Sequence, residues 1–200
     1  MNERKEKAFL EIMELTKSFS ISLRKESIRG SAIICATIIE ESLSMIIKAQ
    51  LTRSLKKDDE LFEGAYAPLG TFSAKIDFAY RMGLIDHYDR SSFHIIRKIR
   101  NEFAHSFDDI TFESPVVKDL IKELFKFNDV LLGVFGNAAK EVYKIKGTLP
   151  EDLNSEPGRD FIFKVLGWRG VYEMVGSILA AVTRVQCQLI IQIKPFEHRK

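Results

Sequence analysis

The amino-acid sequence predicts an all-α protein, folded as a single-domain helical bundle. Apolar residues recur at helical spacing through most of the 200 residues, only five prolines interrupt the chain, and strand-like alternation is rare. A chain of this length with 46% hydrophobic residues can bury one full core. We therefore expect one helical domain over residues 1–200.

The N-terminal part predicts two long helices. An amphipathic helix covers about residues 2–23, and a second, more apolar helix runs from about 31 to 55. Residues 24–30 connect them, and this short connection predicts that the two helices pack as a hairpin. Residues 56–67 are polar and predict a loop.

Two further helices are expected before residue 106. Pro68-Leu69-Gly70 breaks the chain ahead of a short helix over about 72–82, and Gly83 is suited to cap the C-terminus of that helix. Asp86 has a side chain that is preferred at an N-cap. It is expected to begin the next helix, which ends near His105.

The C-terminal half is expected to be helical around one loop. Residues 106–114 form a connector, after which Pro115 takes the first position of another helix. Residues 147–158 contain two prolines and three acids and predict a surface loop. A last helical region spans about 160–193 and is interrupted around 167–170.

This last region carries an apolar face with small residues that allow close helix contact. The spacing fits either the core or a dimer seam, and the sequence leaves both interpretations open. The face consists of Met174, Gly176, Ile178, Ala180, Ala181, Val182, Val185 and Leu189.

The charge balance argues against a general attraction to nucleic acid. The 30 basic and 28 acidic residues nearly cancel, so any contact with RNA or DNA has to be local. Cys35 and Cys187 lie in apolar runs, without a CxxC pair or a Cys/His cluster. This pattern predicts two small core residues and no metal site.

The sequence also predicts a cytoplasmic protein with no membrane span. Residues 1–7 alternate in charge and lack the apolar core of a signal peptide, and no uncharged run approaches the ~18 residues of a span. Walker, GxGxxG, HExxH and GxSxG motifs are absent from the sequence. The usual signals of nucleotide hydrolysis, dinucleotide binding, zinc proteolysis and α/β-hydrolase chemistry are therefore missing, and we expect no cofactor.

The candidate catalytic or binding residues lie on the helix that ends near His105. At ~100° per residue, its apolar residues and its polar residues fall on opposite sides. We expect the apolar side to be buried and the polar side to face a groove or solvent. The apolar side comprises Ile95, Ile96, Ile99 and Phe103. The polar side comprises His94, Arg97, Asn101 and His105, with Arg100 at its edge, and we call these five residues the polar stripe.

The polar stripe has two interpretations. As a site it binds an anion, because an imidazole with a pKa of about 6.5 can take the proton of a ribose 2′-hydroxyl while a guanidinium holds the phosphate. As structure, the same residues cap nearby backbone or pair with the carboxylates of Glu40, Glu41 or Asp108.

Several segments together resemble the mannitol operon repressor (MtlR) family. They are Arg29-Gly30, Glu40 to Leu43, Ala67 to Ile76, Ala79 to Ile85, Ile96 to His105 and Ile110 to Pro115. The resemblance covers about residues 29–124, and beyond them only the helical character is similar. It implies a helical fold and a repressor-like role in transcription regulation, without a recognisable DNA-binding motif.

The spacing Arg100-Asn101-x-x-x-His105 also resembles the motif of the broader HEPN class of helical proteins. Many members of this class are metal-independent ribonucleases that act as dimers with a composite site. The resemblance implies that Arg100 grips phosphate, that His105 is the acid or base, and that Asn101 supports them. One position departs from the motif. HEPN toxins often carry a tyrosine two places after the histidine, and Phe107 stands there, without the hydroxyl.

Two functional hypotheses follow. The first is a non-enzymatic, homodimeric, repressor-like regulator that acts through another regulatory protein and does not itself read a DNA sequence. The alternative is a HEPN-type ribonuclease or toxin that acts on RNA with Arg100, Asn101 and His105. In both hypotheses the binding groove is formed by the polar stripe.

Overall fold

The computed structural model describes residues 3–52, 54, 58–106, 109–134, 136, 142, 144 and 155–191. Within these ranges the chain forms six helices and no strand, which confirms the all-α prediction. The helices are α1 (Glu3–Arg24), α2 (Ile28–Gln50), α3 (Phe72–Arg81), α4 (His87–His105), α5 (Pro115–Val134) and α7 (Glu156–Ile191).

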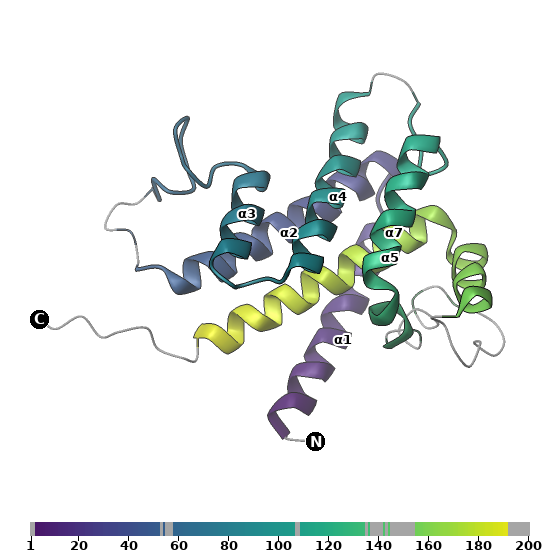
Figure 1. The fold of residues 1–200 in the computed structure, drawn as a ribbon, viewed down its shortest axis with the longest axis horizontal. Helices are drawn as coiled ribbons and strands as arrows, with labels where there is room; N and C mark the ends of the chain where they lie inside the picture. The colour runs from purple at the N-terminus through teal and green to yellow at the C-terminus, as the bar shows by residue number, and fades with distance from the viewer. Residues whose placement is uncertain are drawn as a thin grey trace, which may run out of the picture.

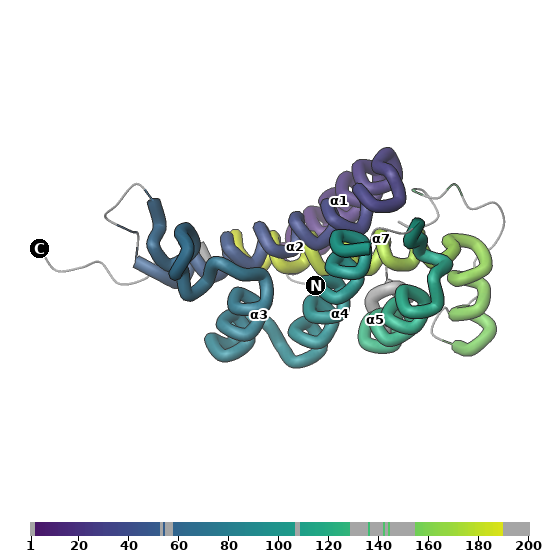
Figure 2. The backbone as a smooth tube through the Cα atoms, turned by 90° about the horizontal axis from the view of Figure 1, so that it is seen from above, coloured from purple at the N-terminus to yellow at the C-terminus, as the bar shows by residue number. Residues whose placement is uncertain are grey.

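Helices α2 and α7 lie side by side at the centre of the bundle (Figure 1). Ser31 is bonded to Glu173, and Glu41 lies 3.8 Å from Arg184, so residue numbers rise together and the two helices run parallel. Helix α1 packs on one side of this pair, and α3, α4 and α5 cover the other side (Figure 2). The helix α4 that carries the polar stripe therefore packs directly on α2.

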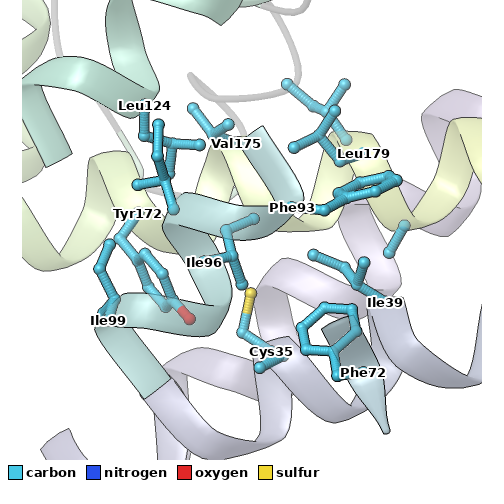
Figure 3. Close-up of a cluster of buried hydrophobic side chains, with 14 of the residues drawn as sticks. Cys35, Ile39, Phe72, Phe93, Ile96, Ile99, Leu124, Tyr172, Val175 and Leu179 are labelled. Carbon is cyan, nitrogen blue, oxygen red and sulfur yellow. The ribbon is translucent and has the colours of Figure 1, made fainter. Parts of the chain in front are cut away.

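The core fills the space between the central pair and α4 (Figure 3). Side chains from α2, α3, α4, α5 and α7 meet there, and each is almost completely buried. Burial of each such side chain contributes roughly 1.5 to 3 kcal/mol relative to leaving it exposed. The labelled residues are Cys35, Ile39, Phe72, Phe93, Ile96, Ile99, Leu124, Tyr172, Val175 and Leu179.

The start and end of α2 differ from the prediction. The helix begins at Ile28 rather than at residue 31, because the Ser27 side chain accepts a hydrogen bond from the Gly30 amide and caps the first turn. The sequence interpretation placed Gly30 in the connection between the two helices. The helix ends at Gln50, five residues earlier than expected, and Leu51 is its C-cap.

The ends of α3 and α4 agree with the prediction. Gly83 follows the C-cap of α3 with φ 69°, a left-handed conformation that glycine adopts without strain. The Asp86 side chain accepts from the Tyr88 and Asp89 amides at the start of α4. Burial, and then the charge of Asp86, raise the pKa of Asp89 to about 6, although its hydrogen bond from the Asp86 amide opposes the shift.

Helix α7 is bent where the sequence predicts an interruption. Gly167 has φ 66° and ψ 174°, which is not helical, and Figure 1 shows the chain turning between the two parts. The helix begins at Glu156, so the predicted loop over 147–158 is wrong for its last three residues. The rest of that loop, apart from Ser155, and the end of the predicted helix at 192–193 lie outside the described residues.

The small residues of α7 belong to the core. A Cβ atom on Gly176 would fall on the Cys35 sulfur of α2, so glycine permits the close approach of the two central helices. Ala180 is also buried, as are both cysteines, Cys35 and Cys187. Of the two interpretations of this face, the structure supports the core.

Two helices have the length and composition that could cross a membrane, α2 and α7. Within the bundle, 50% of the apolar window of α2 and 67% of that of α7 are buried. Core helices of globular proteins meet the same criteria, and these two helices form the centre of this fold.

Candidate functional site

Helix α4 divides into the two sides that the spacing predicts. Ile95 is 2% exposed, and Ile96, Ile99 and Phe103 are fully buried, so the expectation for the apolar side is confirmed. On the other side, His105 is exposed, and the remaining four residues of the polar stripe are partly buried. Their surroundings differ along the helix.

His94, at the first end of the stripe, is held by α3. Its Nε2 atom lies 3.2 Å from Oδ1 of Asp77, which also accepts two hydrogen bonds from Arg90 at 2.9 and 2.6 Å. Burial opposes ionisation of Asp77, but the hydrogen bonds and charges of Arg90 and His94 outweigh it and lower the pKa of that carboxyl. His94 thus connects α4 to α3.

Arg100 meets the carboxylate that the sequence suggested. Its Nη2 atom lies 3.9 Å from Oε2 of Glu40 on α2, which is a long contact. The other oxygen of Glu40 accepts a hydrogen bond of 2.7 Å from Lys75 Nζ on α3, and sequence reasoning did not find this lysine. Three helices therefore contribute charged groups to this point. Glu41, the second acid considered, lies 3.8 Å from Arg184 instead.

The C-terminal end of α4 gains a cation that sequence reasoning also missed. The guanidinium of Arg29, in the first turn of α2, donates to the Ser106 carbonyl at 3.0 Å. This bond brings Arg29 next to the residue that follows His105. Arg29 could have been found only from its position at the start of a helix that runs antiparallel to α4. Recognising that position requires the pairing of α2 with α4 to be known.

The second half of α4 therefore gathers Arg97, Arg100, Asn101 and His105, and His94 is engaged elsewhere. We call the region between Arg29 and Glu40 on α2 and this half of α4 the α2–α4 seam. An arrangement of guanidinium groups, an amide and an exposed imidazole can bind an oxyanion and exchange a proton with it. Phe107 and Asp108 lie outside the described residues.

A second polar group lies between α2 and α7, and sequence reasoning did not predict it. Glu173 is 1% exposed, accepts a hydrogen bond of 2.6 Å from the Ser31 hydroxyl and pairs with Arg169 Nε at 2.6 Å. Arg169 also donates to the Leu23 and Glu26 carbonyls. We call Ser31, Arg169 and Glu173 the α2–α7 network. The sequence feature that could have revealed this network is an acidic residue, Glu173, in an apolar run and four residues after Arg169.

Next to this network, two titratable groups are held neutral. Burial raises the pKa of Cys35 to about 12, with Glu173 adding to the shift and a hydrogen bond with Tyr172 opposing it. Burial also raises the pKa of Tyr172 well above its ordinary value, and the positive charge of Arg100 opposes this shift. The Tyr172 hydroxyl donates to the Ala32 carbonyl at 2.9 Å. Both groups serve packing, and their acidity is suppressed.

Among the residues that the structure describes, no metal cluster marks the polar stripe, and the hollow that these residues line lies elsewhere. In the described ranges no three His, Cys, Asp or Glu side chains are grouped so that they could hold a metal ion. A hollow of about 480 Å³ lies between α5 and the start of α7, away from the stripe. It mixes cations, acids and phenyl rings: Lys122, Phe125, Lys126, Glu156, Arg159, Asp160 and Phe163.

No family model matches the chain, and neither curated proteins nor solved structures show a significant similarity to it.

Proposed function

We propose that this protein is a repressor-like regulator of transcription that acts in the cytoplasm through another regulatory protein. The repressor role rests on the resemblance of residues 29–124 to the mannitol operon repressor family. The mode of action is supported by large exposed side chains around the connection between α3 and α4.

We call Tyr80, Met82 and Tyr88 around this connection the corner surface, and their exposed fractions are 39%, 49% and 52%. Tyr88 lies on the side of α4 that faces α5, with its ring centre 6.2 Å from that of Phe127. Tyrosine, methionine and arginine are enriched where proteins bind one another. The Arg90 guanidinium stacks 5.4 Å from the centre of the Tyr80 ring, and Asp77 fixes it there. Part of the surface is thus ordered before binding, which lowers the entropic cost of association. This observation carries the proposal.

The distribution of ion pairs supports a protein partner over direct DNA binding. Binding to the DNA backbone needs cations that are available to neutralise phosphates. Many cations of this protein already lie beside carboxylates. The pairs are Lys48 with Asp59, Lys75 with Glu40, Arg90 with Asp77, Lys118 with Glu113, Lys122 with Asp119, Arg169 with Glu173, and Arg184 with Glu41.

The test is complementation of cells that lack the gene. Transcripts that rise in those cells should return to normal with the wild-type protein and with Tyr66→Ser, because Tyr66 is 99% exposed and outside the corner surface. The double variant Tyr80→Ser/Tyr88→Ser should fold and fail to repress. Repression by the double variant, or a footprint of the purified protein alone on the affected promoters, would contradict the proposal.

A second candidate is a metal-independent ribonuclease of the HEPN type. It is favoured by the position of Arg29, which places another cation beside Ser106, the residue that follows His105, and by the long 3.9 Å contact between Glu40 and Arg100. In such an enzyme the guanidinium groups would hold the scissile phosphate while His105 exchanges a proton with the ribose. A composite site of this kind requires a homodimer, so sedimentation should show two chains.

The ribonuclease is tested with RNA in the presence of EDTA. Cleavage by the wild-type protein that is lost in His105→Ala and kept in His87→Ala would make this candidate the better one. His87 is a matched control because it is also exposed and lies at the opposite end of α4. Intact RNA with all three proteins would leave the regulator as the sole candidate.

A further inference from the structure

Glu40 lies between two cations that it holds unequally. Lys75 Nζ is 2.7 Å from Oε1, a hydrogen-bonded ion pair, whereas Arg100 Nη2 is 3.9 Å from Oε2, beyond hydrogen-bond distance. The negative charge of Glu40 is therefore balanced mainly by Lys75. Arg100 remains near the carboxylate without being bound by it.

Burial strengthens the Lys75–Glu40 pair further, relative to the contact between Arg100 and Glu40. The side chain of Lys75 is 11% exposed, that of Glu40 is 24% exposed, and that of Arg100 is 32% exposed. Charges attract more strongly as water is excluded, so the inner pair of Lys75 and Glu40 is the stronger one. Arg100, at the outer side, is the group that an incoming ligand can reach.

The α2–α4 seam also has more positive than negative charge. Lys75 and Arg100 face a single carboxylate, and Arg97 precedes Arg100 by three residues on the same helix, where like charges repel. The Nε atom of Arg97 is buried and has no hydrogen-bond acceptor among the residues that the structure describes. A buried Nε–H is closed to a ligand, so Arg97 contributes its positive charge to the seam and not this donor.

The other nearby carboxylates have partners of their own. Asp77 on α3 accepts from Arg90 and lies beside His94, Glu41 on α2 faces Arg184, and Glu173 on α7 is bonded to Arg169 and Ser31. In the part of the chain that the structure describes, these three carboxylates therefore do not neutralise the excess positive charge of the seam.

We propose that the α2–α4 seam binds a phosphate oxyanion through Arg97 and Arg100, and that Lys75 is a positioning residue that keeps Arg100 available by occupying Glu40. The proposal deepens the second candidate function, on whose phosphate ligand it rests. Without Lys75, Glu40 would take Arg100 as its partner, and the anion would lose its accessible guanidinium. The phosphate can come from an RNA backbone or from free phosphate.

The test measures binding of a labelled single-stranded oligouridylate and, by competition, of inorganic phosphate. Lys75→Gln should weaken binding by about tenfold, the factor expected for one charge-assisted contact. Lys48→Gln is the matched control, since it removes a lysine charge from the C-terminal end of α2, where Lys48 pairs with Asp59. This variant should bind like the wild type. Lys75→Arg should restore binding, because it can still occupy Glu40.

A second measurement separates positioning from a general loss of charge. In Lys75→Gln the Nε–H signal of Arg100, assigned by its loss in Arg100→Lys, should shift as the guanidinium binds Glu40. In Lys75→Gln/Glu40→Gln that shift should disappear and binding should return. Unchanged binding in Lys75→Gln, an unmoved Arg100 signal, or a double variant as weak as the single one would overturn the inference.

The outcomes also separate this inference from the ribonuclease. Binding of the oligouridylate without cleavage supports the anion site and contradicts the enzyme. Binding of inorganic phosphate, measured directly by calorimetry, without any oligonucleotide binding supports the anion site and assigns it a small ligand. Binding of neither probe by the wild-type protein contradicts the anion site.

Discussion

Two groups of polar side chains lie on the core helices, and they differ in burial and in partners. In the α2–α7 network, Glu173 is 1% exposed and is bonded to both Ser31 and Arg169. In the polar stripe, Arg100 is held at 3.9 Å and His105 is exposed. Buried polar groups have to be satisfied within the fold, whereas partly exposed ones can exchange partners. The comparison indicates that the network serves folding, and we propose that the second half of the stripe, from Arg97 to His105, serves binding.

The largest expected change in the free energy of unfolding comes from the apolar face of α4, opposite the polar stripe. Phe103 is fully buried and packs on Phe112, with ring centres 4.8 Å apart. Phe103→Ala should lower the free energy of unfolding by ~3 to 5 kcal/mol, the usual loss when a buried aromatic side chain is truncated. Urea denaturation measures it. A loss below ~1 kcal/mol would mean that this face of α4 contributes little to the core.

The largest effect within the comparison should come from the network. Glu173→Ala leaves the Ser31 hydroxyl and the Arg169 guanidinium without their buried acceptor, which should cost about 2 to 4 kcal/mol, less than for a fully buried pair because Arg169 is 30% exposed. Glu102→Ala, on the exposed surface of α4, is the control and should change stability by less than ~0.5 kcal/mol. Equal melting temperatures for both variants would remove the structural role of the network.

The close contact between the two central helices can be tested in the same way. Gly176→Ala places a Cβ on the Cys35 sulfur, so the helices have to move apart, at a cost of about 1 to 3 kcal/mol. Cys35→Ala in the same chain removes the sulfur and should recover most of this loss. If the double variant is no more stable than Gly176→Ala, the contact does not determine the spacing of α2 and α7.

A smaller, pH-dependent effect is expected at the start of α4. The pKa of Asp89 is about 6 in the folded protein, above its ordinary value of 3.8, so the folded state holds this proton more tightly than the unfolded state. The stabilisation is complete below pH 4 and is lost as the pH rises through 6, by on the order of 1 to 2 kcal/mol. Unfolding of Asp89→Asn from pH 4 to 7 should lack this contribution, and an unchanged pH profile would contradict it.

Periodicity was enough to predict the helices and both sides of α4, because a helix buries residues at a fixed spacing. The caps at Asp86 and Gly83 were also predictable, since they depend on side-chain type near a helix end. The pairing of α2 with α7 was not, because glycine and alanine suit a core and a dimer seam equally well. Lys75 was missed for another reason. Its partner Glu40 is 35 residues away in the sequence, and only the fold brings the two side chains together.

We propose that the second half of the polar stripe, from Arg97 to His105, serves binding and not folding. The most direct test is the free energy of unfolding of Asn101→Ala/His105→Ala, measured in urea beside Glu173→Ala. We expect the stripe variant to stay within about 0.5 kcal/mol of the wild type, because exposed and half-exposed polar side chains contribute little to stability. A loss as large as that of Glu173→Ala would show that the stripe is held by buried hydrogen bonds, and would contradict the claim.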